Sequence, residues 1–166
     1  SGLISSASQH GVDIPIMSAA VEVNASMPGY IAEKAKAVLG GSLEGKKLAV
    51  LGLAFKAGTS DARRSPAVAL ANILSKNGAQ VSAYDPEAME EAAEDLRPDI
   101  KQSTSLLPCI AEADGVFVAT DWPEFTSMDI SELANKMTGN LVVDCMNCLD
   151  AERVKAEKLH YIGVGR

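Results

Sequence analysis

The residues best suited to binding chemistry lie between an apolar run and the start of a helix. The run Leu48–Leu51 is apolar throughout, as expected for a strand buried on both faces. Phe55, Lys56 and Arg63 follow it, and Ser65-Pro66 is then typical of a helix N-cap and a first helical residue. Because α/β sheets bind nucleotides beyond the carboxyl ends of parallel strands, this loop is the predicted ligand site.

The side chains of this loop suit a ligand that carries rings and phosphates. The Phe55 ring can lie against a base or a sugar, and the Lys56 ammonium can donate to phosphate or hydroxyl oxygens. Arg63 and Arg64 precede a helix N-terminus, where anions bind readily. The alternative is a solvated basic turn, and the residues of the loop by themselves favour it, because loops are polar in general.

The same loop departs from the fingerprint of a dinucleotide site. That fingerprint needs Gly-x-Gly-x-x-Gly, so that the backbone can approach a pyrophosphate. Here Gly52 and Gly58 frame the turn and the second glycine is missing. Asp85 follows the next apolar run, where a ribose-binding acid would lie, but Asp85-Pro86 is also an ordinary turn pair. The sequence therefore predicts a Rossmann-like sheet that does not bind NAD in the usual way.

The elements that position this loop alternate between short apolar runs and helical stretches. This alternation predicts an α/β fold, a Rossmann-like parallel sheet with flanking helices that is preceded by a helical segment. The predicted strands span residues 47–53, 80–84, 115–119, 141–143 and 161–164, with a weak strand near Ile100. The predicted helices run from Pro66 to a stop at Asn77-Gly78, and then over 87–96, 105–113, 130–136 and 151–158.

The first part of the chain, residues 3–39, has a helical apolar stripe and no strand. Ile14-Pro15 breaks the helical pattern and Met27-Pro28-Gly29 marks a second irregularity. Such a segment cannot form a core alone, so it must pack on the rest of the chain or on a partner. We expect it to mediate a homodimer.

Composition excludes several classes of partner. The net charge of the 166 residues is −7, so a nucleic-acid surface is not expected. No apolar run reaches the ~20 residues of a membrane span. No signal peptide is visible, since Ser1-Gly2 reads as an internal start or a tag remnant. The odd number of cysteines favours a reducing, cytoplasmic setting.

Two of the three cysteines form a Cys-x-x-Cys pair, Cys145 and Cys148, at the end of a predicted strand. Such a pair can be redox-active or half of a zinc site, but zinc would need two further ligands. The histidines, His10 and His160, are far apart in the sequence. We therefore predict no metal site, and interpret the pair as reduced apolar filler.

Several stretches taken together resemble one known family. Leu51–Lys56 with Thr59, Asp61, Arg63 and Ser65-Pro66 resembles the signature of the UDP-glucose/GDP-mannose dehydrogenase family, in its C-terminal, nucleotide-sugar-binding domain. Ala20–Asn24 is similar to the central helix of that family. The resemblance implies a division into residues 1–40, part of the central dimerisation helix, and 41–166, the nucleotide-sugar-binding domain. Further matching stretches are Tyr84-Asp85-Pro86, Ala113-Asp114, Thr120-Asp121-Trp122 with Phe125, Val142-Val143-Asp144 and Tyr161–Arg166.

The resemblance implies roles for individual residues. Phe55 and Lys56 match the pair that contacts the nucleotide sugar, and Arg63 matches an arginine that reaches across to NAD. Met146 stands where the family has an arginine that contacts the sugar nucleotide. The catalytic cysteine of the family lies in a Cys-(Phe/Leu)-Pro-Lys-Asp stretch that these residues do not contain, so we predict no catalytic residue here. NAD would be held mainly by an N-terminal domain outside this stretch.

The expected function is therefore that of one part of an enzyme. The resemblance implies the UDP-sugar-binding domain of an NAD-dependent UDP-glucose 6-dehydrogenase, in which the C6 hydroxyl of the sugar becomes a carboxylate. Alone, the chain is expected to bind a UDP-sugar weakly and to be inactive. The alternatives are a stand-alone nucleotide-binding or dimerisation module, a GDP-sugar or UDP-N-acetylhexosamine dehydrogenase part, and a redox or zinc module built on Cys145 and Cys148.

Overall fold

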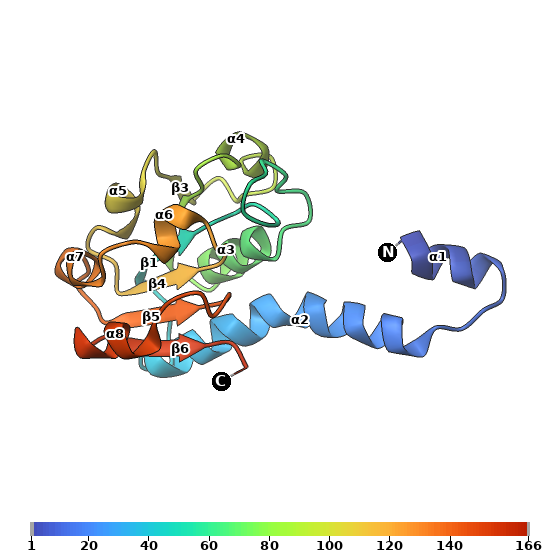
Figure 1. The fold of residues 1–166 in the computed structure, drawn as a ribbon, viewed down its shortest axis with the longest axis horizontal. Helices are drawn as coiled ribbons and strands as arrows, with labels where there is room; N and C mark the ends of the chain where they lie inside the picture. Colours follow the sequence, from blue (N-terminus) through green and yellow to red (C-terminus); the bar gives the residue numbers. More distant parts are fainter. Residues whose placement is uncertain (1, 166) are drawn as a thin grey trace.

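The fold is a six-stranded, all-parallel sheet with helices on both faces and one long helix that projects from it (Figure 1). It is known from a computed structural model that describes residues 2–165. The strand order is β3-β2-β1-β4-β5-β6, the order of doubly wound dinucleotide-binding sheets. The strands are β1 (Lys47–Leu51), β2 (Gln80–Tyr84), β3 (Lys101–Gln102), β4 (Gly115–Val118), β5 (Leu141–Asp144) and β6 (His160–Gly163). The predicted α/β fold class is confirmed.

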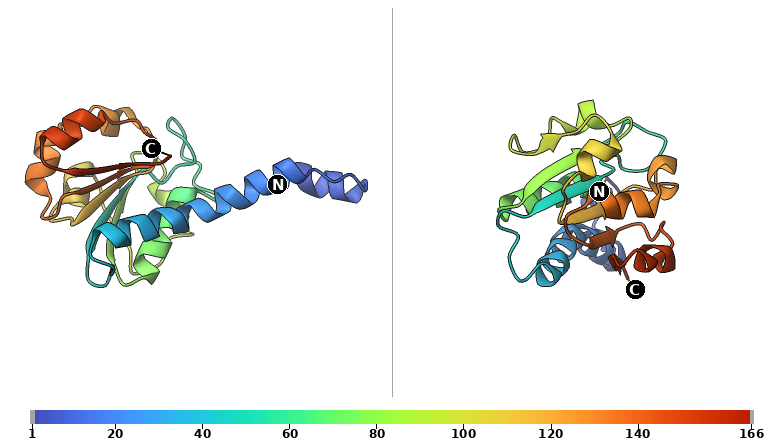
Figure 2. Two further views of the ribbon diagram at one scale, coloured as in Figure 1. Left: turned by 90° about the horizontal axis from the view of Figure 1, so that it is seen from below. Right: turned by 90° about the vertical axis from the view of Figure 1, so that its left-hand side faces the viewer.

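The helices form two layers around this sheet. The end of α2 and helix α3 cover one face, while α5 and α7 lie together on the other and α8 packs on β6 (Figure 2). The helices are α1 (Gly2–Gln9), α2 (Pro15–Val38), α3 (Pro66–Lys76), α4 (Met89–Ala92), α5 (Leu106–Ile110), α6 (Pro123–Thr126), α7 (Ile130–Lys136) and α8 (Ala151–Ala156).

Helix α3 begins and ends as its sequence predicts. The Ser65 hydroxyl accepts a hydrogen bond from the backbone N–H of Ala67, and Pro66 is the first helical residue. Asn77 caps the other end, and Gly78 follows with a φ of +90°, a conformation that glycine adopts at little cost. The capping chemistry of the sequence was therefore sufficient to place both ends of the helix that follows the candidate loop.

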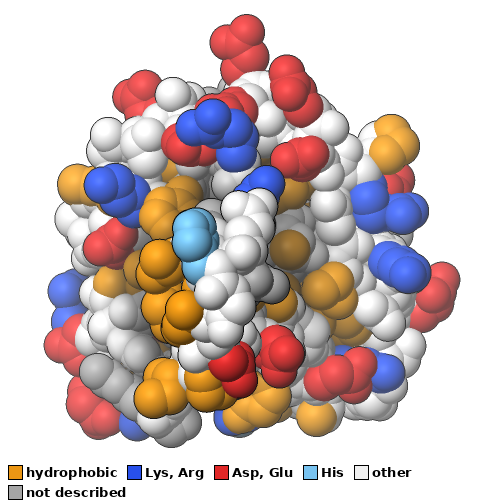
Figure 3. Space-filling model, turned by 90° about the vertical axis from the view of Figure 1, so that its right-hand side faces the viewer, with side chains coloured by type: hydrophobic (Ala, Val, Ile, Leu, Met, Phe, Trp, Pro, Cys, Tyr) orange, Lys and Arg blue, Asp and Glu red, His pale blue; other side chains and the backbone are white. Residues whose placement is uncertain are grey.

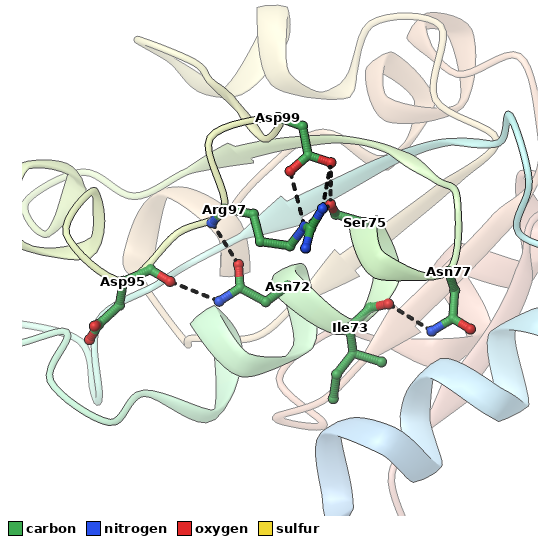
Figure 4. A network of polar contacts seen from close by, with 7 residues as sticks. All are labelled: Asn72, Ile73, Ser75, Asn77, Asp95, Arg97 and Asp99. Carbon is green, nitrogen blue, oxygen red and sulfur yellow. Dashed lines mark hydrogen bonds and ion pairs between the residues drawn. The ribbon is translucent and has the colours of Figure 1, made fainter.

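The helix predicted over residues 87–96 is wrong beyond its first turn, because α4 ends at Ala92. Side chains of α3 hold the following segment in an irregular path (Figure 4). Asn72 donates to the carbonyl of Asp95 at 2.8 Å and accepts from the backbone N–H of Arg97 at 2.9 Å. Ser75 and Arg97 both bond to the carboxylate of Asp99. These long-range bonds take the place of the helical ones.

Other predicted boundaries shift by a few residues. The first strand stops at Leu51 instead of residue 53, because the backbone N–H groups of Leu53 and Ala54 donate to a side-chain acceptor described below. The last helix ends at Ala156, two residues early, and Lys158 adopts a φ of +62°. Pro123 opens the short helix α6, which is not among the predicted helices.

Helix α2 has two different halves. Pro28 lies inside the helix and does not interrupt it, contrary to the predicted irregularity. From there on, Ile31, Ala32 and Ala35 are buried in the same core as the sheet. The first half projects away from the sheet, and α1, which precedes it in the chain, lies at the far end of this projection (Figure 2). The core thus continues across residue 40, while the division of the chain at that point stays a prediction.

Candidate functional site

The candidate site lies at the ends of the neighbouring strands β1 and β4 and in the loops that follow them. Gly52 follows β1 with a φ of +93°, and a Cβ on it would lie 2.5 Å from the Cβ of Thr120, the second residue after β4. The Thr120 hydroxyl donates to the carbonyl of Ala54 at 3.0 Å. Only glycine allows this approach, so the two loops are packed together at the point where a doubly wound sheet binds its ligand.

Asp85, the residue that follows β2, binds backbone N–H groups of the loops around the site through its carboxylate. Its carboxylate is 1% exposed and accepts hydrogen bonds from five N–H groups. None of its acceptor capacity is left for a ribose hydroxyl. The five donors are the backbone N–H groups of Leu53, Ala54, Glu87 and Ala88 and the indole N–H of Trp122.

The aromatic residues after β4 serve packing. Trp122 is 8% exposed and points its indole N–H at Asp85. Phe125 is fully buried and makes an edge-to-face contact with Tyr84, with ring centroids 6.0 Å apart. The Tyr84 hydroxyl donates to Glu124, and burial together with that carboxylate raises the pKa of Tyr84 to about 12. These rings therefore stabilise the end of the sheet.

A cavity of about 230 Å³ opens between the carboxyl edge of the sheet and the middle of α2. Phe55, which is 66% exposed, and Met146, which is 45% exposed, lie on its wall together with the N-terminus of α3. Most of its surface is apolar. The lining residues are Met27, Pro28, Ile31, Ala54, Phe55, Ser65, Pro66, Ala67, Leu70, Ala119, Cys145, Met146 and Val164.

The three residues singled out in the sequence differ in their surroundings. Phe55 lines the cavity, while Lys56 is exposed beside it and is not part of its wall. Arg63 is 76% exposed and pairs with Asp61 through two bonds of 3.0 and 2.8 Å, and with Glu91 of α4 at 3.4 Å. The structure therefore brings Phe55 and Met146 together and leaves Arg63 on the outer side of the loop.

The Asp61–Arg63 pair has an electrostatic signature. Hydrogen bonds from the Arg63 side chain and backbone lower the pKa of the Asp61 carboxyl to about 2, and the carboxylate in turn raises the pKa of Arg63. The backbone N–H of Phe55 donates to the carbonyl of Asp61 at 2.8 Å, which closes the loop on itself. The loop that carries Phe55 and Lys56 thus has a defined shape without a ligand.

The Cys-x-x-Cys pair has little redox or metal-binding character. Burial, with the nearby Asp144 carboxylate, raises the pKa of the Cys145 and Cys148 thiols to about 12. Both are free thiols, and the thiolate is the reactive form. Within residues 2–165, no cluster of three or more His, Cys, Asp or Glu side chains is placed to hold a metal ion. The same described residues contain no helix long and apolar enough to cross a membrane.

The sequence left two contributors to the site unrecognised. Met27, Pro28 and Ile31 of α2 form one wall of the cavity, although the chain places them far from the loop. Met27-Pro28-Gly29 was a visible signal, but it pointed to a helix break instead of a wall. Asp144 is the second, because its buried carboxylate holds the loop after β5 through the N–H groups of Met146 and Leu149.

Comparison with known proteins gives a consistent picture. The sequence model of the UDP-glucose/GDP-mannose dehydrogenase family, UDP binding domain, matches residues 49–151. UDP-glucose 6-dehydrogenase of Rhizobium meliloti is 35% identical over 164 residues, which cover 99% of this chain and 37% of that protein. The Rickettsia conorii UDP-glucose 6-dehydrogenase is 33% identical over 157 residues, 94% of this chain and 36% of that protein. The chain thus spans about a third of the length of the curated relatives it matches.

Solved structures agree with these matches. A UDP-glucose dehydrogenase from Pyrobaculum islandicum superposes with a TM-score of 0.80 at 32% identity, over 98% of this chain and 35% of that one. A UDP-D-ManNAc dehydrogenase from Pyrococcus horikoshii superposes with a TM-score of 0.79 at 28% identity, over 96% of this chain and 36% of that one.

Proposed function

The chain belongs to the UDP-glucose/GDP-mannose dehydrogenase family, and we propose that it is the UDP-sugar-binding domain of an NAD-dependent UDP-glucose 6-dehydrogenase. In that enzyme the C6 hydroxyl of the sugar is oxidised to a carboxylate. The observation that carries the proposal is the cavity at the carboxyl edge of the sheet, with Phe55 on its wall and Lys56 beside it. This is the position at which doubly wound sheets bind nucleotides.

The cavity holds only part of such a ligand. About 230 Å³ is below the ~300–1,000 Å³ of typical ligand pockets, so a nucleotide sugar extends beyond it. We place a ring of the ligand against Phe55 and its phosphate oxygens at the Lys56 ammonium, which is exposed to solvent. A further part of the enzyme then covers the remainder, which fits a chain that matches only about a third of its relatives.

The residues of this chain do not fit a whole NAD molecule. The backbone N–H groups of Leu53 and Ala54, which a dinucleotide fingerprint would offer to a pyrophosphate, already donate to Asp85. Asp85 itself is buried and saturated. We therefore propose that another part of the enzyme holds most of the NAD, and that the exposed Arg63 is the group of this chain that reaches it.

We also propose a homodimer through residues 1–40. Ile16 and Val23 of α2 are 85% and 58% exposed, and both lie on the half that projects from the sheet. Apolar side chains gather around this projecting end (Figure 3). A second copy of the segment would bury them, since large apolar surfaces mark association sites.

We also propose a cytoplasmic location, as the sequence predicts, because the free thiols at Cys145 and Cys148 fit that reducing compartment.

Calorimetric titration of UDP and of GDP into the chain tests the binding proposal. We expect saturable binding of UDP, and displacement of UDP by UDP-glucose from the same site. Absence of binding by UDP, or equal affinities for UDP and GDP, would contradict the proposed substrate class.

A further inference from the structure

We propose that Asp85 is a positioning residue that sets both halves of the ligand-contacting surface, the Phe55-Lys56 segment and Arg63. This inference rests on the proposed function, because it assumes that those residues meet the ligand. It assigns Asp85 a role that differs from the ribose contact expected at this position of a dinucleotide site.

One carboxylate oxygen fixes the Phe55-Lys56 segment. Oδ2 of Asp85 accepts from the backbone N–H of Leu53 at 2.7 Å and from that of Ala54 at 2.9 Å. The carbonyl of Ala54 in turn accepts from the hydroxyl of Thr120. Three successive peptide groups that lead into Phe55 are therefore held, two through their N–H and one through its carbonyl, and the direction in which Phe55 and Lys56 leave the sheet follows from these bonds.

The other oxygen fixes the start of α4. Oδ1 accepts from the backbone N–H groups of Glu87 and Ala88, at 2.9 and 2.8 Å, in the turn that leads into α4. Glu91 on that short helix lies 3.4 Å from the Arg63 guanidinium. Asp85 thus also sets where Glu91 lies, the second acidic partner of Arg63 beside Asp61.

Only a side chain with two acceptor oxygens can do this at position 85. Among the described residues, no ion pair includes Asp85, so its charge is compensated by N–H dipoles alone. A carboxylate offers about four lone-pair sites on two oxygens. In Asp85→Asn one oxygen becomes an NH₂ group, which would face N–H donors. Either the Leu53–Ala54 side or the Glu87–Ala88 side then loses its acceptor.

A double-mutant cycle tests whether Asp85 acts through Lys56. We would titrate UDP into the wild-type chain, Lys56→Ala, Asp85→Asn and the double variant. We expect Lys56→Ala to weaken binding by roughly tenfold to a hundredfold, Asp85→Asn to weaken it by at least as much, and the double variant to be no weaker than Asp85→Asn, because a displaced Lys56 contributes nothing. Independent effects, in which the loss in the double variant equals the product of the two single losses, would overturn the proposal.

A ligand-free measurement separates this proposal from the binding proposal. Hydrogen–deuterium exchange of residues 52–64 or of residues 86–92, whichever side loses its acceptor, should speed up at least tenfold in Asp85→Asn, and both segments should stay unchanged in Asp150→Asn, a matched change at the remote N-cap of α8. If Asp85→Asn does not fold, Trp122→Phe removes a single donor to Oδ2 and should give the same change on a smaller scale. Unchanged exchange of both residues 52–64 and residues 86–92 would refute the positioning role, whether or not UDP binds.

Discussion

The indole Nε1 of Trp122 lies 3.1 Å from Oδ2 of Asp85, so the single tryptophan of the chain touches the carboxylate that organises the candidate site. The two residues are 37 positions apart and leave the sheet from different strands. Their bond joins the loop after β4 to the loops after β1 and β2. Tryptophan fluorescence therefore reports on this junction alone.

We expect Trp122→Phe to lower the free energy of unfolding by about 1–3 kcal/mol, because it removes a charge-assisted hydrogen bond and leaves a small void. Urea denaturation followed by circular dichroism measures the loss. Phe125→Tyr is not a suitable control, because Phe125 is fully buried. Tyr84→Phe is suitable, since it deletes only the hydroxyl that bonds to Glu124, and a comparable loss there would show that the Asp85 bond has no special weight.

We expect Lys56→Ala to weaken UDP binding by roughly tenfold to a hundredfold, because a charge-assisted hydrogen bond contributes about 1.5–3 kcal/mol. Calorimetry on the purified chain measures the change. Lys136→Ala, at the exposed end of α7, is the matched control and should bind UDP as the wild type does. Equal affinities for all three proteins would make Lys56 a solvated loop residue.

Met146→Arg should tighten UDP binding by roughly tenfold. Met146 lies on the wall of the cavity at 45% exposure, and a guanidinium there would add bidentate donors next to the ligand phosphates. Met146→Leu, which keeps the apolar character and nearly the volume, is expected to leave the affinity unchanged. A loss of affinity in the arginine variant would mean that an apolar part of the ligand occupies this wall.

The Asp61–Arg63 contact should fail only at strongly acidic pH. The pKa of the Asp61 carboxyl is lowered from 3.8 to about 2, so the contact is fully present above 3.8 and is lost as the pH falls through about 2. Titration of the Asp61 carboxyl carbon by NMR measures this directly. In Arg63→Ala the pKa should return towards 3.8, and an unchanged value would show that Arg63 is not its cause.

Sedimentation at micromolar concentration should show a dimer for the wild-type chain. Ile16→Glu combined with Val23→Glu should yield a monomer, because two charges would be buried in the proposed interface. Asn24→Glu adds a charge on the same segment without removing an apolar group. If the double variant still sediments as a dimer, residues 1–40 are not the interface.

Local signals in the sequence determined the order of the elements and several of their limits. β2 and α7 lie where the sequence predicts, at 80–84 and 130–136, and α3 follows its Ser65-Pro66 cap. Buried runs and caps act within a few residues, which is why a sequence alone reveals them. The alternation of strands and helices likewise requires parallel pairing of the strands, and parallel pairing with helical connections defines the α/β fold class.

Only the tertiary structure decided what surrounds the candidate site. Asp85 bonds to Leu53, Ala54 and Trp122, which are more than 30 residues away in the sequence. No local sequence pattern around Asp85 predicts those bonds. Long-range contacts also explain two further features. Helix α2 forms one wall of the cavity, and residues 93–100 follow α3 because its side chains bond to their backbone. Buried polar groups must find partners wherever the packed chain brings donors and acceptors together, and that geometry exists only once the sheet has formed.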